Sequence, residues 1–231
     1  REHKVTQRKP SMKTVVDESP VVFVVDDDDS MRQALSRLFL SVKLRVEAFA
    51  SPQQFLGSLR PDVPSCLVLD VRLPGLNGLD FQADLAKTDI RTPIVFISGH
   101  GDIPMTVRAM KAGAIDFLQK PFRDQDLLDA VAAAIRRDQD RRDKERSIAR
   151  LKTNFETLTT REREIMTLVA SGMMSKQIAV KCGLSEITVK VHRSHLMRKM
   201  GARTAAELVR MAEALGVEPT SFKPSGNRAS S

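Results

Sequence analysis

The chain has 231 residues, of which 42% are hydrophobic and 29% are charged, as is typical of folded soluble domains. No apolar run approaches the roughly 18 residues that span a membrane, and the first 20 residues lack the apolar segment of a secretory signal. We therefore expect a cytoplasmic protein of one large or two small domains, with Met12 as a candidate start and Cys66 and Cys182 as reduced, buried thiols.

The net charge of +8 is distributed unevenly. Residues 21–135 carry 12 Lys and Arg against 15 Asp and Glu, a net charge of −3, whereas residues 158–231 carry 12 against 6, a net charge of +6. Residues 136–157 add +3 and the first 20 residues add +2. The basic C-terminal half therefore favours a polyanionic partner, either nucleic acid or an anionic membrane surface.

Short apolar runs alternate with helical patterns in the N-terminal half. The predicted strands are Val21–Val25, Leu44–Phe49, Cys66–Leu69, Pro93–Ser98 and Ala114–Gln119. The predicted helices are Met31–Leu40, Ser51–Leu59, Leu79–Lys87, Pro104–Ala112 and one that begins near Asp124. This alternation within 115 residues predicts an α/β fold with a five-stranded parallel, doubly wound sheet.

Five polar residues fall at the carboxyl ends of these strands, where ligands bind in a doubly wound sheet: Asp26, Asp27, Asp70, Ser98 and Lys120. Carboxylates suit Mg²⁺, and a lysine with a hydroxyl can stabilise the oxygens of a transferred phosphoryl group. Each residue alone has a structural explanation, such as a helix cap or a solvated lysine. Their joint occurrence predicts a phosphate acceptor, Asp70, that works with Mg²⁺.

The helix that begins near Asp124 has no stop signal at the end of the first domain. Residues 136–147 are highly charged and contain neither Gly nor Pro, and apolar spacing resumes at Ile148 and Leu151. We predict a single long helix whose middle is solvated. A dimeric coiled coil is the alternative, although sustained heptads are absent.

The C-terminal half is predicted to be all helical. A capping box at Thr159 opens a helix through about Ala170, followed by Ser175–Cys182, Ser185–Met200 and Thr204–Leu215. The second and third of these helices, joined at Gly183-Leu184, form a helix-turn-helix pattern. Its second helix is expected to bury Ile187, Val191 and Met197, with partial exposure allowed for Val191, and to present polar groups outward. An ordinary solvated amphipathic helix is the alternative.

The N-terminal half resembles the receiver domain of two-component response regulators. The resemblance covers about residues 20–135 and is carried by VVDDDDS (24–30), VLDVRLPGLNG (68–78), ISGHGD (97–102) and FLQKPF (117–122). It implies the flavodoxin-like fold and phosphorylation of Asp70 by a sensor histidine kinase. Asp27, Asp70 and the backbone carbonyl of Arg72 would bind Mg²⁺, with Asp26 acting largely through water.

The same resemblance implies a conformational switch. Ser98 would move to hydrogen-bond the phosphoryl group, Phe117 would rotate inward behind it, and Lys120 would pair with the phosphate. Ser98 stands where Thr is frequent and Phe117 where Tyr is frequent, so the hydroxyl and the ring are kept and the phenol is lost. The Lys120–Pro121 bond would be cis.

Residues 158–204 resemble the LuxR-type DNA-binding domain at almost every expected apolar and capping position. The resemblance implies that Lys190, Val191 and Ser194 face bases. It assigns phosphate contacts, which determine affinity rather than sequence preference, to three more residues: Thr188, Arg193 and Arg198.

Together the halves resemble a response regulator of the FixJ/NarL type. The expected domains are a basic tail (1–20), a receiver (21–135), a helical linker (136–157), a four-helix LuxR-type helix-turn-helix domain (158–216) and a disordered tail (217–231). The phosphorylated protein would form a homodimer on promoter DNA and regulate transcription, with RNA polymerase as a further partner and no membrane partner.

Two other functions fit parts of this pattern. One is a regulator of the same fold that is never phosphorylated, which the complete set Asp27, Asp70, Ser98 and Lys120 argues against. The other is a Mg²⁺-dependent phosphohydrolase with an aspartyl-phosphate intermediate. Such enzymes commonly need a carboxylate two residues after the nucleophile, where this chain has Arg72, so we expect no enzyme.

Overall fold

The computed structural model describes residues 19–99 and 103–217. Within them the chain divides into two compact units, with the boundary between Arg142 and Asp143. Most of both predicted tails and residues 100–102 of the ISGHGD motif lie outside the described residues. None of the helices described is long and apolar enough to cross a membrane.

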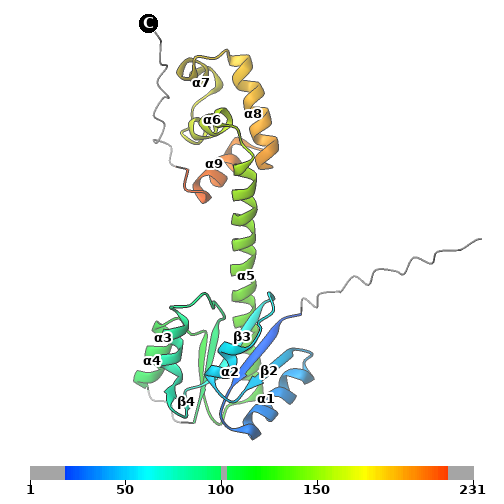
Figure 1. Cartoon of the computed structure of the whole chain (residues 1–231), viewed down its shortest axis with the longest axis vertical. Coiled ribbons are helices and arrows are strands. Elements are labelled where there is room, and N and C mark those ends of the chain that lie inside the picture. The colour runs from blue at the N-terminus through cyan, green and yellow to red at the C-terminus, as the bar shows by residue number, and fades with distance from the viewer. Residues whose placement is uncertain (1–18, 100–102, 218–231) are drawn as a thin grey trace, which may run out of the picture. The chain divides into compact units, whose positions relative to one another are not determined.

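The first unit is built on a five-stranded parallel sheet in the order β2-β1-β3-β6-β7. Its strands are β1 (Val21–Val25), β2 (Arg45–Phe49), β3 (Ser65–Asp70), β6 (Ile94–Ser98) and β7 (Asp116–Gln119). Figure 1 shows the sheet with helices packed around it. The predicted α/β fold class is therefore confirmed.

Helices cover both faces of this sheet, and the strand sequences show why. Every residue of β1 and β3 is buried, because alternate side chains enter separate cores on the two faces. The covering helices are α1 (Asp29–Ser41), α2 (Pro52–Gly57), α3 (Gly78–Leu85), α4 (Ile103–Lys111) and the start of α5. The loop before α3 also holds a short antiparallel pair that the sequence did not predict, β4 (Arg72–Leu73) with β5 (Leu76–Asn77).

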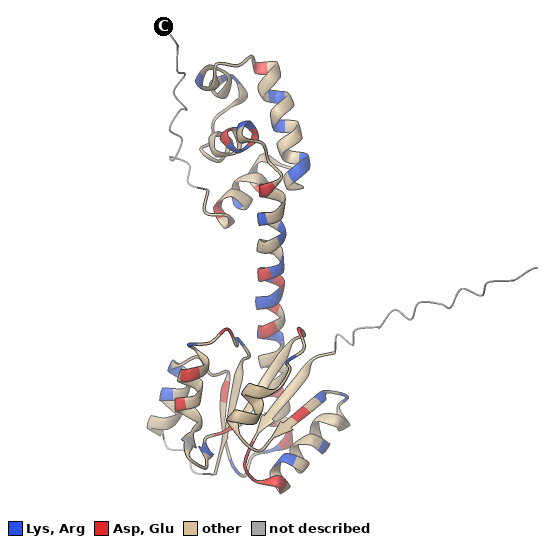
Figure 2. Ribbon diagram, in the orientation of Figure 1, with Lys and Arg blue, Asp and Glu red and all other residues tan. Residues whose placement is uncertain are grey.

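Helix α5 runs without interruption over Asp124–Glu156, 33 residues, which confirms the predicted long helix. Charged residues follow one another along its middle, as the blue and red segments of the ribbon show in Figure 2. The prediction that this middle is solvated holds for residues 143–150 but is wrong at Asp138, which is fully buried. Hydrogen bonds to Ser65 and two arginines compensate for the burial of its charge.

The second unit contains α6 (Thr160–Ala170), α7 (Ser175–Cys182), α8 (Glu186–Met200) and α9 (Ala205–Ala214), as predicted. The capping box of Thr159 and Glu162 opens α6. Gly183, with φ of 62°, makes the turn between α7 and α8, a conformation that favours glycine. The two cysteines are free, Cys66 being buried as predicted and Cys182 only partly buried.

Candidate functional site

Three aspartates meet at the carboxyl edge of the sheet in the first unit. Asp26 and Asp27 follow β1, and Asp70 ends β3, the neighbouring strand. A carboxylate oxygen from each lies within 4.8 Å of those from the other two. Asp26 is fully buried and Asp70 is 7% exposed, whereas Asp27 is exposed. The structure thus brings together the three carboxylates that the sequence predicted as Mg²⁺ ligands.

Lys120 supplies positive charge to this cluster from the end of β7. Its Nζ atom lies 2.8 Å from Asp26 Oδ2 and 2.7 Å from Asp70 Oδ2. The peptide bond between Lys120 and Pro121 is cis, as predicted. Burial raises the pKa of Asp26 even though Lys120 opposes the change. Burial also acts to lower the pKa of Lys120, but hydrogen bonds to the two aspartates outweigh it and the net pKa is raised. The lysine therefore stays charged between them.

The predicted switch residues lie on the adjoining strands. Ser98 is fully buried at the end of β6, and the strand register places Asp70 opposite the preceding residue, Ile97. Phe117 is partly buried on β7, with its ring centroid 6.1 Å from that of Phe96. A hydroxyl and a partly exposed ring therefore lie on the side of Asp70 where β6 and β7 continue the sheet.

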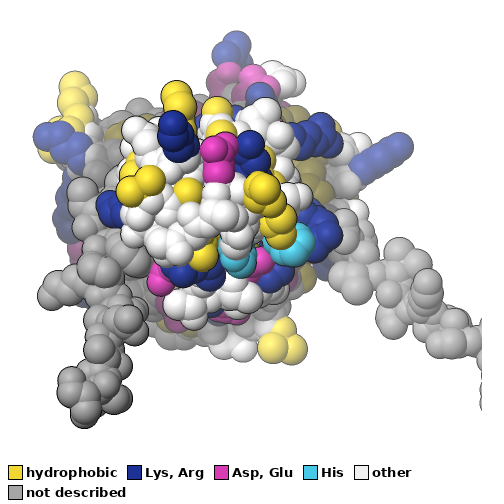
Figure 3. All heavy atoms as spheres, turned by 90° about the horizontal axis from the view of Figure 1, so that it is seen from above, with side chains coloured by type: hydrophobic (Ala, Val, Ile, Leu, Met, Phe, Trp, Pro, Cys, Tyr) yellow, Lys and Arg dark blue, Asp and Glu magenta, His cyan; other side chains and the backbone are white. Residues whose placement is uncertain are grey.

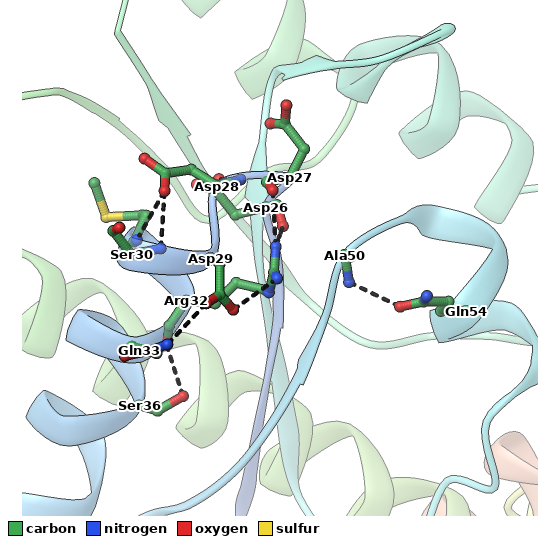
Figure 4. Close-up of polar contacts among 11 residues, drawn as sticks. Asp26, Asp27, Asp28, Asp29, Ser30, Arg32, Gln33, Ser36, Ala50 and Gln54 are labelled. Carbon is green, nitrogen blue, oxygen red and sulfur yellow. Dashed lines mark hydrogen bonds and ion pairs between the residues drawn. The ribbon is translucent and has the colours of Figure 1, made fainter.

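Arg32 is a residue of this site that sequence reasoning missed. Its Nη1 atom donates to the carbonyl oxygens of Asp26 at 2.8 Å and Asp27 at 2.9 Å, and Nη2 pairs with Asp29 at 2.9 Å. Figure 4 shows the guanidinium group beneath the loop, with the Asp27 carboxylate pointing away from it. The i,i+3 spacing of Asp29 and Arg32 was the available signal. Asp28 caps α1 by accepting from the amides of Ser30 and Met31.

The backbone around Asp70 is closely packed. The amide of Arg72 donates to Asp70 Oδ1 at 2.9 Å, which orients the carboxylate. Gly78 lies against the same residue, because a Cβ atom there would stand 2.6 Å from the Asp70 carbonyl oxygen. The second glycine of the LPGLNG sequence, Gly78, is therefore needed for this contact.

The helix-turn-helix of the second unit presents one exposed stripe of α8, and here a prediction is wrong. Ile187 and Val191, expected on the buried side, are 75% and 48% exposed, and only Met197 of that set is partly buried. The buried side consists instead of Val189, Leu196 and Met200. Because apolar residues occur around most of α8, their spacing did not reveal which side faces the core.

Four of the six residues predicted to contact DNA lie on the exposed stripe: Lys190, Val191, Ser194 and Arg198. Ile187 and His195 lie on it too and were missed. The other two predicted residues are partly buried and engaged within the unit, since Thr188 contacts Ser185 and Arg193 donates to Ser175 Oγ at 2.9 Å. Figure 3 shows basic, apolar and histidine side chains intermingled on one face of this unit.

Comparison with known proteins identifies both units. Residues 22–132 match the response regulator receiver domain, and residues 156–212 match the bacterial regulatory proteins of the luxR family. Nodulation protein W of Bradyrhizobium diazoefficiens is 62% identical over 85% of this chain and 87% of that protein. The chain belongs to the two-component response regulators. The transcriptional regulatory protein FixJ of Azorhizobium caulinodans is 39% identical to this response regulator over 87% of its chain and 96% of that protein.

Solved structures agree with this assignment. The response regulator StyR has a TM-score of 0.75 and 47% identity, covering 84% of this chain and 98% of that one. Full-length FixJ from B. japonicum has a TM-score of 0.52 and 37% identity, covering 85% and 97%. The family comprises transcriptional regulators and not enzymes, so the phosphohydrolase alternative is set aside.

Proposed function

We propose that this response regulator accepts a phosphoryl group on Asp70 from a sensor histidine kinase, and that phosphorylation promotes dimerisation and promoter binding. The observation that carries the proposal is the position of Lys120 Nζ, within 2.8 Å of both Asp26 and Asp70 at the carboxyl edge of the sheet. A permanent cation between two buried carboxylates is suited to a site where negative charge accumulates.

The transfer moves a phosphoryl group from a histidine nitrogen to an aspartate oxygen. The P–N bond breaks, a P–O bond forms to an Asp70 carboxylate oxygen, and the released electron pair stays on the imidazole nitrogen. Lys120 Nζ stabilises the phosphoryl oxygens electrostatically, and the Ser98 hydroxyl donates to one of them. The Arg72 amide, 2.9 Å from Asp70 Oδ1, holds the carboxylate in position for attack.

The acidic cluster fits Mg²⁺, which prefers oxygen ligands and tolerates a site with few protein ligands. Asp27, Asp70 and the backbone carbonyl of Arg72 would hold the ion, with Asp26 acting through water. Bound Mg²⁺ would neutralise charge on the carboxylates and the phosphoryl oxygens. Arg32 keeps the Asp26–Asp27 backbone in place through their two carbonyl oxygens.

Helix α4 offers a surface for the dimer. Ile103, Val107 and Met110, spaced along one face, are 81%, 44% and 42% exposed. Movement of Ser98 and Phe117 toward the phosphoryl group would repack the neighbouring strands and change this face. Two helix-turn-helix units joined in a dimer would bind paired half-sites more tightly than one, because the second binding event becomes intramolecular.

The exposed stripe of α8 would enter the major groove. Lys190, Val191 and Ser194 would face bases, while Arg198 would neutralise a phosphate. Lys190 has its ammonium group 2.9 Å from Glu186, an exposed pair that can exchange for a base or phosphate contact at low cost. Thr188 and Arg193 would contact phosphates from the edge of the stripe.

The proposal is tested by phosphorylation of the full chain with radiolabelled acetyl phosphate and Mg²⁺. Asp70→Asn should abolish acid-stable, base-labile labelling, and the labelled parent should bind selected promoter fragments more tightly than the unlabelled protein. The matched control is Asp84→Asn, which removes an exposed aspartate on α3 whose ion pair with Lys87 lies at the surface. Unchanged labelling in Asp70→Asn would refute Asp70 as the acceptor.

A further inference from the structure

The described part of α5 has a polar contact with the receiver unit that neither phosphoryl transfer nor DNA binding requires. The apolar stripe that packs α5 on the sheet includes Leu127, Val131 and Ala134 and ends at Ile135. The next residues are almost all charged, yet Asp138 is fully buried. Burying a carboxylate costs free energy unless it is paired and hydrogen-bonded. The partners of Asp138 therefore show what its burial achieves.

The partners of Asp138 come from two sides. Its Oδ2 atom accepts hydrogen bonds from the backbone amide of Ser65 at 2.9 Å and from Ser65 Oγ at 3.3 Å. On α5 itself, Arg141 pairs with Oδ1 at 2.5 Å and Arg142 Nε with Oδ2 at 2.8 Å. Arg142 also pairs through Nη1 with Asp62, in the loop before β3. We refer to these five residues as the α5 latch.

The amide of Ser65 is a strand donor that the sheet does not use. In β3 the amide of Leu67 points toward β6, where it donates to Pro93. The amide of Ser65, two residues earlier, points the same way, but the β3–β6 register begins only at Leu67 opposite Ile94. Asp138 therefore completes the ladder of β3 with a side chain from α5.

This geometry fixes the register of α5 on the receiver. Sliding the helix by one residue would rotate Asp138 by about 100° around the helix axis and leave its charge and the Ser65 amide without their partners. Apolar contacts alone tolerate small shifts, whereas a buried ion cluster has one satisfied arrangement. The latch thus extends the rigid part of α5 from Ile135 to Arg142.

The latch also contacts the strands that carry the phosphorylation site. Ser65 begins β3, which ends at Asp70. Ser65 Oγ lies 3.4 Å from Thr92 Oγ1, just before β6, which ends at Ser98. The acceptor and the switch hydroxyl therefore stand at one end of these strands, and the latch at the other.

We propose that Asp138 is a positioning residue that makes α5 move with β3 and β6, so that rearrangement of the receiver reaches the helix at Arg142. Without the latch, residues 136–142 would separate from the receiver. A rearrangement of β3 and β6 would then no longer move this part of α5. The inference rests on the proposed function, because it requires phosphorylation of Asp70 to change DNA binding.

The test is the phosphorylation-dependent change in DNA affinity of the full chain. The DNA dissociation constant, on a fragment selected from a random duplex library, is measured before and after acetyl phosphate treatment, and labelling of Asp70 is measured in parallel. Asp138→Asn should label like the parent, while its affinity gain on phosphorylation falls by about fivefold or more. Hydrogen exchange should become faster at the amides of residues 136–142.

Two controls separate positioning from stability. Asp140→Asn removes an exposed aspartate of the same helix and should keep the parent's affinity gain. Val131→Ala weakens the packing of α5 but leaves the latch intact, so a loss of stability alone should not remove the gain. Arg142→Gln weakens the latch while keeping the Asp138–Ser65 bonds, so it should lose part of the affinity gain on phosphorylation. This variant keeps the test valid even if Asp138→Asn folds poorly.

The outcomes distinguish this inference from the proposed function. If the parent labels but gains no affinity, the proposed switch fails. If the parent gains affinity and both Asp138→Asn and Arg142→Gln keep the full gain, the latch has no role in coupling. An equal loss in Val131→Ala would also overturn the inference, since general stability would then explain it.

Discussion

The residues proposed to act in the receiver unit are mostly buried or partly buried, whereas those proposed to act in the helix-turn-helix unit are mostly exposed. Asp26 and Ser98 are fully buried and Asp70 nearly so, with Lys120 bonded to both aspartates. On α8, by contrast, the Lys190 side chain is 66% exposed and pairs with Glu186, whose side chain is 45% exposed.

This difference follows from what each surface must recognise. A transferring phosphoryl group is stabilised by charges already fixed in place and shielded from water. A DNA groove is met by side chains that can exchange water and neighbouring partners for bases and phosphates. We therefore expect receiver substitutions to change stability and labelling together, and α8 substitutions to change DNA binding alone.

Removal of Lys120 should have the largest effect. Lys120→Met leaves Asp26 and Asp70 buried beside each other without a cation, so the free energy of unfolding should fall by about 3 kcal/mol in Mg²⁺-free buffer. Added Mg²⁺ should restore part of it, while labelling by acetyl phosphate stays at least about 100-fold below the parent. Urea titrations with and without Mg²⁺ measure the two changes in stability, and radiolabelled acetyl phosphate measures the labelling.

The matched control is Lys87→Met. Lys87 also pairs with an aspartate, Asp84, at 2.9 Å, but the two side chains are 75% and 61% exposed. Its loss should leave the free energy of unfolding nearly unchanged, because solvent screens an exposed pair. Equal costs for the two lysines would contradict the contrast between buried and exposed charge.

Gly78→Ala should come next. The new Cβ atom would stand 2.6 Å from the Asp70 carbonyl oxygen, and this backbone can move only by displacing the acceptor. We therefore expect the free energy of unfolding to fall by about 2 kcal/mol and the labelling to become slower. At Gly57 no atom lies within 4 Å of an added Cβ, so Gly57→Ala should leave the labelling unchanged and the stability unchanged or slightly higher. Normal labelling in Gly78→Ala would show that the acceptor tolerates displacement.

The acceptor site could be predicted because its residues follow a simple geometric rule. Asp26, Asp70, Ser98 and Lys120 each stand at the end of a parallel strand, and parallel strands end at one edge of the sheet. The rule needs only the order of strands and turns. It gives no account of Arg32, whose hydrogen bonds to backbone oxygens leave no pattern in the sequence, so that only its i,i+3 spacing from Asp29 was visible.

Two other features required the coordinates. The buried side of α8 was assigned wrongly because Ile187, Val189 and Val191 alternate along a helix that is apolar on several sides. The burial of Asp138 was missed because its partner Ser65 is 73 residues away and a single aspartate in a charged helix resembles a solvated one. Long-range polar pairs of this kind are not encoded in local periodicity.

The exposed stripe of α8 should show the opposite behaviour to the receiver site. Ile187→Ala should weaken binding to the selected DNA by about 1 kcal/mol without changing the salt dependence, because an apolar side chain contacts thymine methyl groups and not phosphates. Arg198→Gln should weaken binding and lower the salt slope by about one. Thermal unfolding should be unchanged in both.

Arg210→Gln is the control for Arg198, since it removes an exposed arginine from α9, away from the stripe. Filter binding at several salt concentrations distinguishes the three variants. A drop in salt slope for Arg210→Gln equal to that of Arg198→Gln would mean that α8 has no special share in phosphate contacts.

The smallest effect should come from Glu162, the one charged residue that is buried among the described residues of the second unit. It is 3% exposed, accepts from the Thr159 amide at 2.8 Å and pairs with Lys199 at 2.6 Å. Burial acts to raise its pKa, but Lys199 and the Thr159 bonds outweigh burial and hold the pKa of this carboxyl below its usual value. Glu162→Gln keeps an acceptor for Thr159 and loses the ion pair with Lys199. We therefore expect the free energy of unfolding to fall by about 1 kcal/mol at neutral pH.

The pH dependence gives this prediction its sign. Because the folded pKa is below the unfolded one, the stabilisation by Glu162 is complete above the ordinary glutamate pKa of about 4.3 and is lost as pH falls through the folded value. The difference between the parent and Glu162→Gln, followed by hydrogen exchange of α6 amides in the full chain, should therefore shrink in acid. Glu213→Gln, an exposed change on α9, should show no such difference at any pH. A gap between parent and Glu162→Gln that stayed constant down to pH about 3 would contradict the prediction, because the charge of the carboxylate would then not account for the difference in stability.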